Sequence, residues 1–259
     1  MKVNLHTHTT RCGHASGTEE ECVLAAIDAG FTCLGFADHT PFPYEGDYVN
    51  STKMRPEELE GYVQTVLSLK EKYRDQIQIL LGLECESVPR FFPYLKEISR
   101  NMDYLLLGNH GDWSIGEPYA GNLKEPQQLE AYVQTAVEGM ESGLFLYLAH
   151  PDLMLCGYPE FDDAAKDLSR QLCREANRLG LPLEYNLYGL QKKIKPGCLG
   201  YPYTPFWEIA AEENVRACVG VDAHRPENFR DSDFTGAQEM LRGLGILVLE
   251  DPLQGKNAK

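Results

Sequence analysis

Residues 2–39 read KVNLHTHTTRCGHASGTEEECVLAAIDAGFTCLGFADH, which contains a strand, a helix and a second strand in that order. Apolar runs predict strands over Lys2–His6 and Cys33–Ala37, and the stretch Glu19–Ala29 between them has the pattern of an amphipathic helix. The segment Thr18-Glu19-Glu20-Glu21 has the form of a capping box at the start of that helix. A strand, a crossover helix and a second strand predict a parallel pair in one sheet.

The same alternation continues along the rest of the chain. The further strands that we expect are Gln78–Leu83, Tyr104–Gly108, Leu144–Ala149, Leu183–Tyr185, Ala217–Val221 and Ile246–Leu249. The further helices that we expect are Pro56–Tyr73, Tyr94–Arg100, Pro126–Ser142, Asp163–Leu179, Pro205–Glu213 and Gly236–Leu244. This repetition favours an α/β fold with a closed, TIM-like barrel over an open doubly wound sheet. No linker or repeat divides the chain, so we expect a single domain over residues 1–259.

The composition limits the possible partners. Hydrophobic residues make up 43% and charged residues 24% of the chain, which is ordinary for a globular protein. The net charge of −15 disfavours binding to nucleic acid or to an anionic membrane surface. The 8 cysteines form no Cys-x-x-Cys pair, and the N-terminus lacks the layout of a signal peptide. These features predict reduced thiols and a cytoplasmic location.

The histidines carry the clearest functional signal. Two of them form His6-Thr7-His8 at the end of the first expected strand, and most of the others close a short apolar segment. The full set is His6, His8, His14, His39, His110, His150 and His224. The carboxyl ends of parallel strands meet at one mouth of a barrel, so these imidazoles are expected to converge there. Neutral imidazole is a good ligand for zinc, iron and related metals.

Two carboxylates lie at equivalent positions. Glu84 and Asp222 each follow an apolar run, and Asp222-x-His224 repeats the spacing of the His-x-His pair, which places both side chains on one face of a strand. Taken singly, each residue has an ordinary explanation as a core histidine, a solvated charge or a cap. Together they predict a metal cluster. Asp38 and Asp152 either orient ligand imidazoles or simply end strands.

In their order along the chain, these motifs resemble the PHP superfamily of metal-dependent phosphoesterases, in particular its histidinol-phosphatase type. The matching stretches are His6-Thr7-His8, His14, Asp38–Pro43, Gly82-Leu83-Glu84, His110, His150–Leu153 and Asp222–Glu227. The resemblance implies a distorted seven-stranded (β/α) barrel and three divalent metal ions. It divides the candidate ligands into three sets, which are His6, His8, Glu84 and Asp222; Glu84, His110 and His150; and His14, His39 and His224. Zinc, iron and manganese all suit such ligands.

The reaction that this resemblance implies is hydrolysis of a small phosphomonoester. We expect in-line attack by a metal-bridging hydroxide held by Glu84, Asp222 and His224. Neither a serine nor a cysteine nucleophile is required. Histidinol phosphate is the substrate that the resemblance names.

The sequence departs from the family where the substrate phosphate is bound. Basic residues that usually follow the His150 motif are replaced by Met154-Leu155-Cys156-Gly157, and Gln191 stands where the family has an arginine. Glutamine lacks the planar fork with which arginine binds phosphate. The possible replacements are Arg11, Lys192, Lys193 and Arg225, and each is otherwise an ordinary surface charge.

This departure keeps other functions open. One alternative is a PHP phosphoesterase acting on a different small phosphorylated substrate, whose pocket Tyr44, Tyr48, Trp113, Tyr188 and Tyr201 could line. Another is a metal-binding barrel without turnover. A PHP nuclease is disfavoured by the net charge of −15. An amidohydrolase-like barrel is disfavoured because none of the expected strands ends in the lysine that such enzymes carboxylate.

Overall fold

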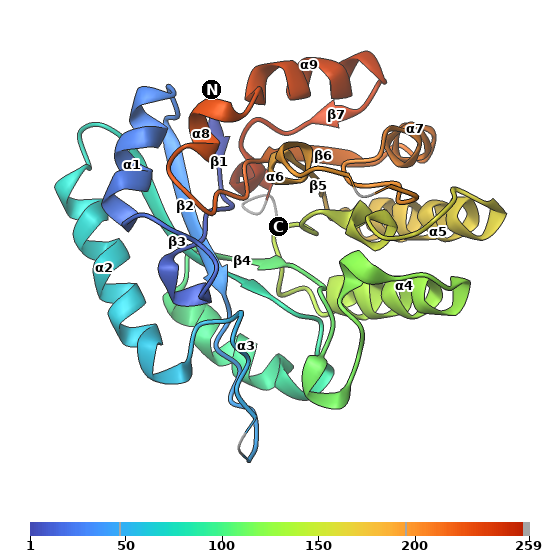
Figure 1. The fold of residues 1–259 in the computed structure, drawn as a ribbon. Coiled ribbons are helices and arrows are strands. Elements are labelled where there is room, and N and C mark those ends of the chain that lie inside the picture. Colours follow the sequence, from blue (N-terminus) through green and yellow to red (C-terminus); the bar gives the residue numbers. More distant parts are fainter. Residues whose placement is uncertain (47, 195, 256–259) are drawn as a thin grey trace.

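The computed structural model describes residues 1–46, 48–194 and 196–255. A curled parallel sheet forms its centre, and helices cover the outside of that sheet (Figure 1). One group of neighbouring strands has the order β1 (Val3–Asn4), β2 (Cys33–His39), β3 (Gln78–Cys85) and β4 (Tyr104–Leu107). The other has the order β5 (Leu183–Asn186), β6 (Arg216–Gly220) and β7 (Leu247–Val248). Every pairing within these groups is parallel, as the strand–helix alternation predicts.

Single bridges connect the two groups of strands on both sides. Leu148 pairs with Leu107 of β4 and with Leu183 of β5, while Thr7 pairs with Ala223 just beyond β1 and β6. The expected strand Leu144–Ala149 is therefore reduced to a bridge. Pro182 has no amide proton for a longer ladder with β5. The regular strands form a half-barrel rather than the complete seven-stranded barrel that we expected.

The seven helices predicted from the sequence are all present in the predicted order, with bounds that differ by a few residues. They are α1 (Glu19–Asp28), α2 (Leu59–Lys72), α3 (Phe92–Ile98), α4 (Pro126–Glu141), α5 (Asp163–Leu179), α6 (Leu187–Gln191), α7 (Thr204–Glu212), α8 (Asn228–Asp231) and α9 (Phe234–Gly243). The capping box at Thr18 is confirmed, and Gly180 ends α5 with a φ of 66°. Helices α6 and α8 were not predicted, because an element of one turn is too short to show periodicity.

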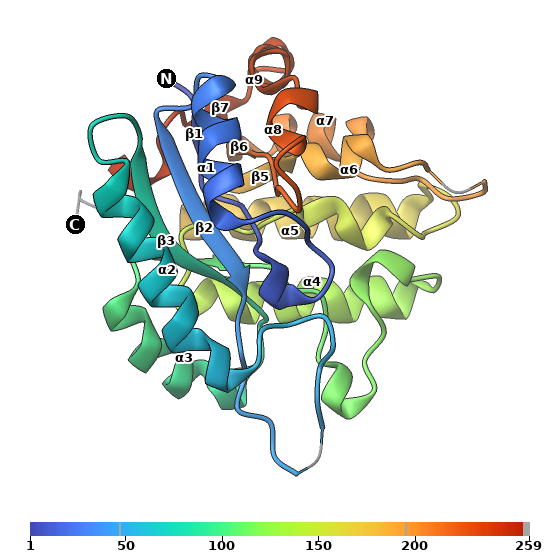
Figure 2. The same ribbon diagram turned by 60° about the vertical axis from the view of Figure 1, so that its left-hand side comes forward.

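The helices cover the two flanks of the sheet separately (Figure 2). In Figures 1 and 2, α1, α2 and α3 lie along the strands β1–β3, whereas α4, α5, α7 and α9 cover the other flank. None of the helices in residues 1–46, 48–194 and 196–255 combines the length and apolar character needed to cross a membrane.

A tyrosine fills the interior of the curled sheet. Tyr104 is 2% exposed, and its hydroxyl donates to the carbonyl of Leu5 at 2.6 Å. Glycines at positions 35 and 82 make room for this ring, since a Cβ on Gly82 would lie 2.5 Å from Tyr104 Cζ. The packing of this interior holds β1, β2 and β3 in the register that brings their ends together.

Gly82→Ala is expected to lower the free energy of unfolding by about 1–3 kcal/mol, because the added methyl group overpacks the Tyr104 ring. Gly61→Ala is the matched control. Nothing lies within 4 Å of a Cβ at this position in α2, so alanine is expected to stabilise that helix by up to about 1 kcal/mol. Urea unfolding of both variants measures the difference, and equal stabilities would contradict this packing.

Candidate metal centre

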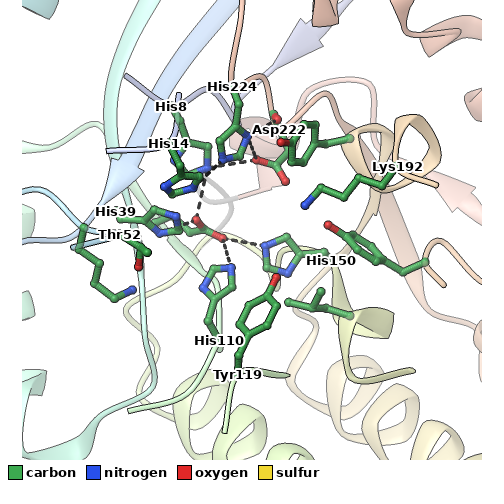
Figure 3. A pocket seen from close by; sticks show the side chains of 15 residues that line it. His8, His14, His39, Thr52, His110, Tyr119, His150, Lys192, Asp222 and His224 are labelled. Atoms are coloured by element: carbon green, nitrogen blue, oxygen red, sulfur yellow. Dashed lines mark hydrogen bonds and ion pairs between the residues drawn. The ribbon is translucent and has the colours of Figure 1, made fainter. Parts of the chain in front are cut away.

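A cavity of about 340 Å³ lies at the carboxyl ends of the strands (Figure 3). Its walls include predicted metal ligands from segments far apart in the sequence, namely His8, His14, His39, Glu84, His110, His150, Asp222 and His224. The remaining predicted ligand, His6, is fully buried beside them, with Nε2 3.5 Å from Glu84 Oε1. The structure thus brings all the predicted ligands to one place.

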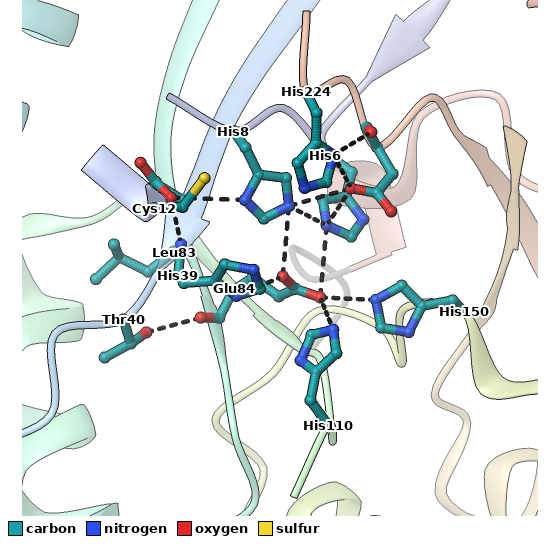
Figure 4. Close-up of polar contacts among 12 residues, drawn as sticks. His6, His8, Cys12, His39, Thr40, Leu83, Glu84, His110, His150 and His224 are labelled. Carbon is teal, nitrogen blue, oxygen red and sulfur yellow. Dashed lines mark hydrogen bonds and ion pairs between the residues drawn. The ribbon is translucent and has the colours of Figure 1, made fainter. Parts of the chain in front are cut away.

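Glu84 lies at the centre of this cluster (Figure 4). It is 1% exposed, and imidazole nitrogens surround both of its carboxylate oxygens. The distances from Glu84 are 2.8 Å to His150 Nε2, 3.1 Å to His39 Nδ1, 3.5 Å to His6 Nε2, 3.5 Å to His8 Nε2 and 3.6 Å to His110 Nε2. Burial alone would raise the pKa of Glu84, but His110, His6 and His39 hold it well below its usual value. Glu84 is therefore an anion shared by several imidazoles.

Asp222 is the second carboxylate of the cluster. Its Oδ1 lies 3.1 Å from His8 Nε2 and 3.4 Å from His6 Nε2. Burial opposes ionisation, yet His6 and His224 hold the pKa of Asp222 well below its usual value. The backbone of Asp222 has a φ of 53° and that of His150 a φ of 31°, a region that non-glycine residues seldom adopt. Such backbone strain is typical of functional sites.

The arrangement of His14 and His224 fits a bound cation. His14 Nδ1 lies 2.8 Å from the carbonyl of Cys12, and His224 Nδ1 lies 3.0 Å from the carbonyl of Asp222. A carbonyl only accepts, so each Nδ1 donates, and each Nε2 of the neutral ring has a lone pair. These two Nε2 atoms face each other at 3.1 Å. Because burial lowers the pKa of both imidazoles, a metal ion suits this space better than a proton.

The buried oxygens lead to the same conclusion. Glu84 Oε2 and Asp222 Oδ1 accept no well-directed hydrogen bond within the described part of the chain. Buried carboxylate oxygens without such partners are costly unless a cation compensates them. Triplets of buried donors lie within 4.8 Å of one another, for example His6, His8 and Asp222, or His6, Glu84 and His150. Mixed nitrogen and carboxylate donors of this kind suit divalent metal ions.

Two further carboxylates, which the sequence reasoning missed, orient the imidazoles. Glu184 accepts from His6 Nδ1 at 2.9 Å and from the His150 amide at 3.2 Å. Glu86 lies 2.9 Å from His110 Nδ1 and pairs with Lys53. Such partners fix the tautomer and the direction of a metal-binding histidine. The spacing Glu84-x-Glu86 could have indicated Glu86, since alternate residues of a strand share a face.

The two aspartates left undecided by the sequence differ in role. Asp38 lies 3.5 Å from His8 Nδ1 and accepts the Thr9 amide at 3.2 Å, so it can orient that imidazole. Asp152 instead accepts the Tyr203 amide at 2.7 Å and Trp207 Nε1 at 3.1 Å. Asp152 therefore secures the start of α7.

The cysteines near the centre are buried thiols. Cys85 receives a hydrogen bond from the Thr40 hydroxyl at 2.9 Å, and burial raises its pKa. Cys12 lies close to His8 and Asp38, and burial raises its pKa to about 12. Both thiols are expected to remain protonated and thus poor nucleophiles.

The outer wall of the cavity is aromatic and includes Lys192, while a second lysine of the lining, Lys53, pairs with Glu86. The Tyr188 ring stacks on His224 at a centroid distance of 4.4 Å, and Lys192 Nζ lies 4.1 Å from the Tyr188 centroid. Tyr201 also lines the cavity, as does Tyr119, which the sequence reasoning did not single out. Lys192 points toward the ligand cluster in Figure 3, and burial lowers its pKa.

The other candidates for substrate binding lie elsewhere. Arg11 pairs with Glu19, and the exposed Arg225 is not among the described residues that line the cavity. Tyr44 and Tyr48 line a separate cavity. The side chain of Trp113 lies outside the described part of the structure.

Comparison with known proteins identifies the family of this chain. The model of the PHP domain family matches residues 4–186. A probable histidinol-phosphatase of Deinococcus radiodurans is 30% identical over 252 residues, which cover 93% of this chain and 92% of that protein. A probable histidinol-phosphatase of Schizosaccharomyces pombe is 28% identical over 252 residues. That match covers 87% of this chain and 81% of the yeast protein.

A solved structure has the same fold. The histidinol phosphate phosphatase of Lactococcus lactis, in complex with zinc, L-histidinol and phosphate, superimposes with a TM-score of 0.72 at 16% identity. The match covers 96% of this chain and 95% of that chain. By its motifs, its ligand cluster and these matches, the chain belongs to the PHP domain family.

Proposed function

We propose that this chain is a metal-dependent hydrolase that cleaves a small phosphomonoester. The observation that carries the proposal is Glu84, an ionised carboxylate buried among five imidazoles at the floor of an open cavity. The histidinol-phosphatase names of the relatives agree with it. We also propose that residues 1–259 are one domain and that the bridges at Leu148 and Thr7 complete a distorted barrel.

The proposed site holds three divalent metal ions, of zinc, iron or manganese. Their ligand sets are His6, His8, Glu84 and Asp222; Glu84, His110 and His150; and His14, His39 and His224. When bound, the ions supply an activated water and neutralise charge on the phosphoryl group. Glu84, Asp222 and His224 mark the position that we assign to the attacking water.

Other side chains of the protein orient the metal ligands and supply positive charge for the phosphoryl group. Glu184 and Glu86 hold the imidazoles of His6 and His110 so that Nε2 of each turns toward Glu84. Lys192 is the ammonium group placed to meet phosphoryl oxygens at the cavity wall. It replaces part of the charge of the missing arginines, but as a point charge rather than a fork.

Histidinol phosphate is the substrate that the relatives' names suggest. The alternative is another small phosphomonoester, which the loss of the family's arginines and the aromatic wall of Tyr119, Tyr188 and Tyr201 favour. A barrel that binds metal without turnover is the remaining alternative. Such a barrel would have the same metal ligands as the proposed hydrolase, but it would not hold a phosphoester where the attacking water could reach the phosphorus.

The test is an assay of the purified protein with zinc, iron or manganese on a panel of phosphomonoesters and phosphodiesters that includes histidinol phosphate. We expect phosphomonoester hydrolysis with a kcat/KM of about 10⁴ M⁻¹s⁻¹ or better for the true substrate. If histidinol phosphate reaches this value, it is the substrate. If no ester is cleaved by metal-loaded protein, the proposed function is wrong.

A further inference from the structure

A second cavity, of about 210 Å³, adjoins the metal centre. The two cavities share the walls formed by Tyr119, Lys192 and Tyr201. The second cavity is therefore the space next to a molecule bound at the metal centre, on the other side of these three side chains. Nothing in the chemistry proposed above uses this space.

The second cavity is basic in a strongly acidic protein. Its described lining residues include Lys124, Lys192 and Lys193 and contain neither aspartate nor glutamate. The whole chain has a net charge of −15, so the local positive charge of three lysines around one small cavity is opposite in sign to the charge of the protein as a whole. This concentration of positive charge favours an anionic ligand.

These ammonium groups can still donate hydrogen bonds to a ligand. Lys124 Nζ donates to the Gly157 carbonyl and lies 3.8 Å from Cys198 Sγ, so one of its three protons remains to meet a ligand. Within residues 1–46, 48–194 and 196–255, neither Lys192 nor Lys193 forms an ion pair with a carboxylate. An oxyanion would supply the acceptors that the protein itself does not offer there.

The direction of Lys192 follows from its neighbour. Gln191 Nε2 donates to Ser232 Oγ at 2.9 Å, and Gln191 Oε1 accepts from Asn228, so this side chain ties α6 to α8. The next residue, Lys192, consequently lies on the cavity side, over the ring of Tyr188. The glutamine that replaces the family's arginine thus has a structural role, while the following lysines face the substrate space.

The described lining of the metal centre offers a cationic group of the substrate no carboxylate beyond the proposed metal ligands. The described carboxylates that line its cavity are Glu84 and Asp222, and both are assigned to metal ions in the proposed function. A substrate with an amine, such as histidinol phosphate, would meet ammonium groups instead of carboxylates at the outer wall. A substrate with a second negative charge would meet complementary groups.

We infer that the second cavity, through Lys124 and Lys193, binds a second anionic group, a carboxylate or a phosphate, on the same substrate whose phosphoryl group is cleaved at the metal centre, while Lys192 lies on the wall between the two groups. This inference rests on the proposed function. It narrows the substrate class to phosphomonoesters that carry a further oxyanion. Charge-assisted hydrogen bonds from ammonium groups are the interaction that selects them.

The experiment compares matched substrates on the metal-loaded enzyme. The pairs are 3-phosphoglycerate with glycerol 3-phosphate, and fructose 1,6-bisphosphate with fructose 6-phosphate. We expect kcat/KM for the doubly anionic member of at least one pair to exceed that of its partner by about tenfold, the effect of one charge-assisted hydrogen bond. The pair that responds identifies carboxylate or phosphate as the second group.

Variants of Lys193 test whether the cavity causes this preference. Lys193→Glu is expected to remove most of the tenfold ratio, Lys193→Arg to retain it, and Lys96→Glu, an equally exposed lysine on α3, to leave it unchanged. Hydrolysis with a ratio near one in both pairs would overturn the inference and leave the proposed function intact. A ratio that survives Lys193→Glu would overturn it as well. Hydrolysis of histidinol phosphate but of none of these four esters would overturn the inference alone, whereas no hydrolysis of any ester of the wider panel would refute both proposals.

Discussion

Glu84→Gln is expected to lower kcat/KM for phosphomonoester hydrolysis by about a thousandfold or more. A metal ion contributes several kcal/mol of transition-state stabilisation, and each ~1.4 kcal/mol corresponds to a factor of ten. Glu84 approaches five imidazoles, and its buried Oε2 accepts no well-directed hydrogen bond in the described part of the chain, so it is the residue through which most of the proposed ligands are connected. An amide of the same size keeps the packing and removes the negative charge.

The control for this variant is Glu130→Gln on α4, where the same change is made at an exposed position. Elemental analysis should find less metal per chain in Glu84→Gln and an unchanged content in Glu130→Gln. Circular dichroism checks that both variants are folded. Full metal content together with full activity in folded Glu84→Gln would rule out the proposed ligand role of this residue.

Glu184→Gln is expected to weaken metal binding by about 10- to 100-fold, as is typical for a carboxylate that orients a metal-binding histidine. Glu184 is fully buried and accepts from four groups, which are His6 Nδ1, the His150 amide, Asn186 Nδ2 and the Tyr147 hydroxyl. A glutamine would turn an NH2 group toward at least one of these donors. His6 would then lose the acceptor that directs its Nε2 toward Glu84.

Glu184 is a positioning residue, so the decisive measurement is metal affinity and not stability alone. Competition with a metal-chelating dye gives the dissociation constant, and thermal unfolding of the metal-free forms gives the structural cost. We expect the affinity to fall in Glu184→Gln well beyond what the loss of stability accounts for. Equal metal affinities of Glu184→Gln and the unaltered protein would show that Glu184 has only a packing role. It packs closely against Gly220 of β6, where an added Cβ would lie 1.9 Å from Glu184 Oε1.

The sequence predicted the elements near the metal centre well because their patterns are local. The capping box at Thr18, the strand that begins at Gln78 and the parallel order of strands each depend on residues a few positions apart. The expected strand Leu144–Ala149 was wrong as a regular strand. Its pairing depends on Pro182, a residue remote in the sequence, and on the turn at His150.

The sequence by itself predicted a metal cluster, through histidines and carboxylates placed where apolar runs end, and its resemblance to the PHP superfamily implied the reaction class. It could do so because strand periodicity and the parallel arrangement dictate that such residues converge. Only the tertiary structure decided which groups orient the imidazoles and what surrounds the substrate. Glu184 accepts from His6, and Lys124 and Lys192 line one cavity, although the members of each pair lie far apart in the sequence. Contacts of that kind arise when the sheet curls and its loops pack over one mouth.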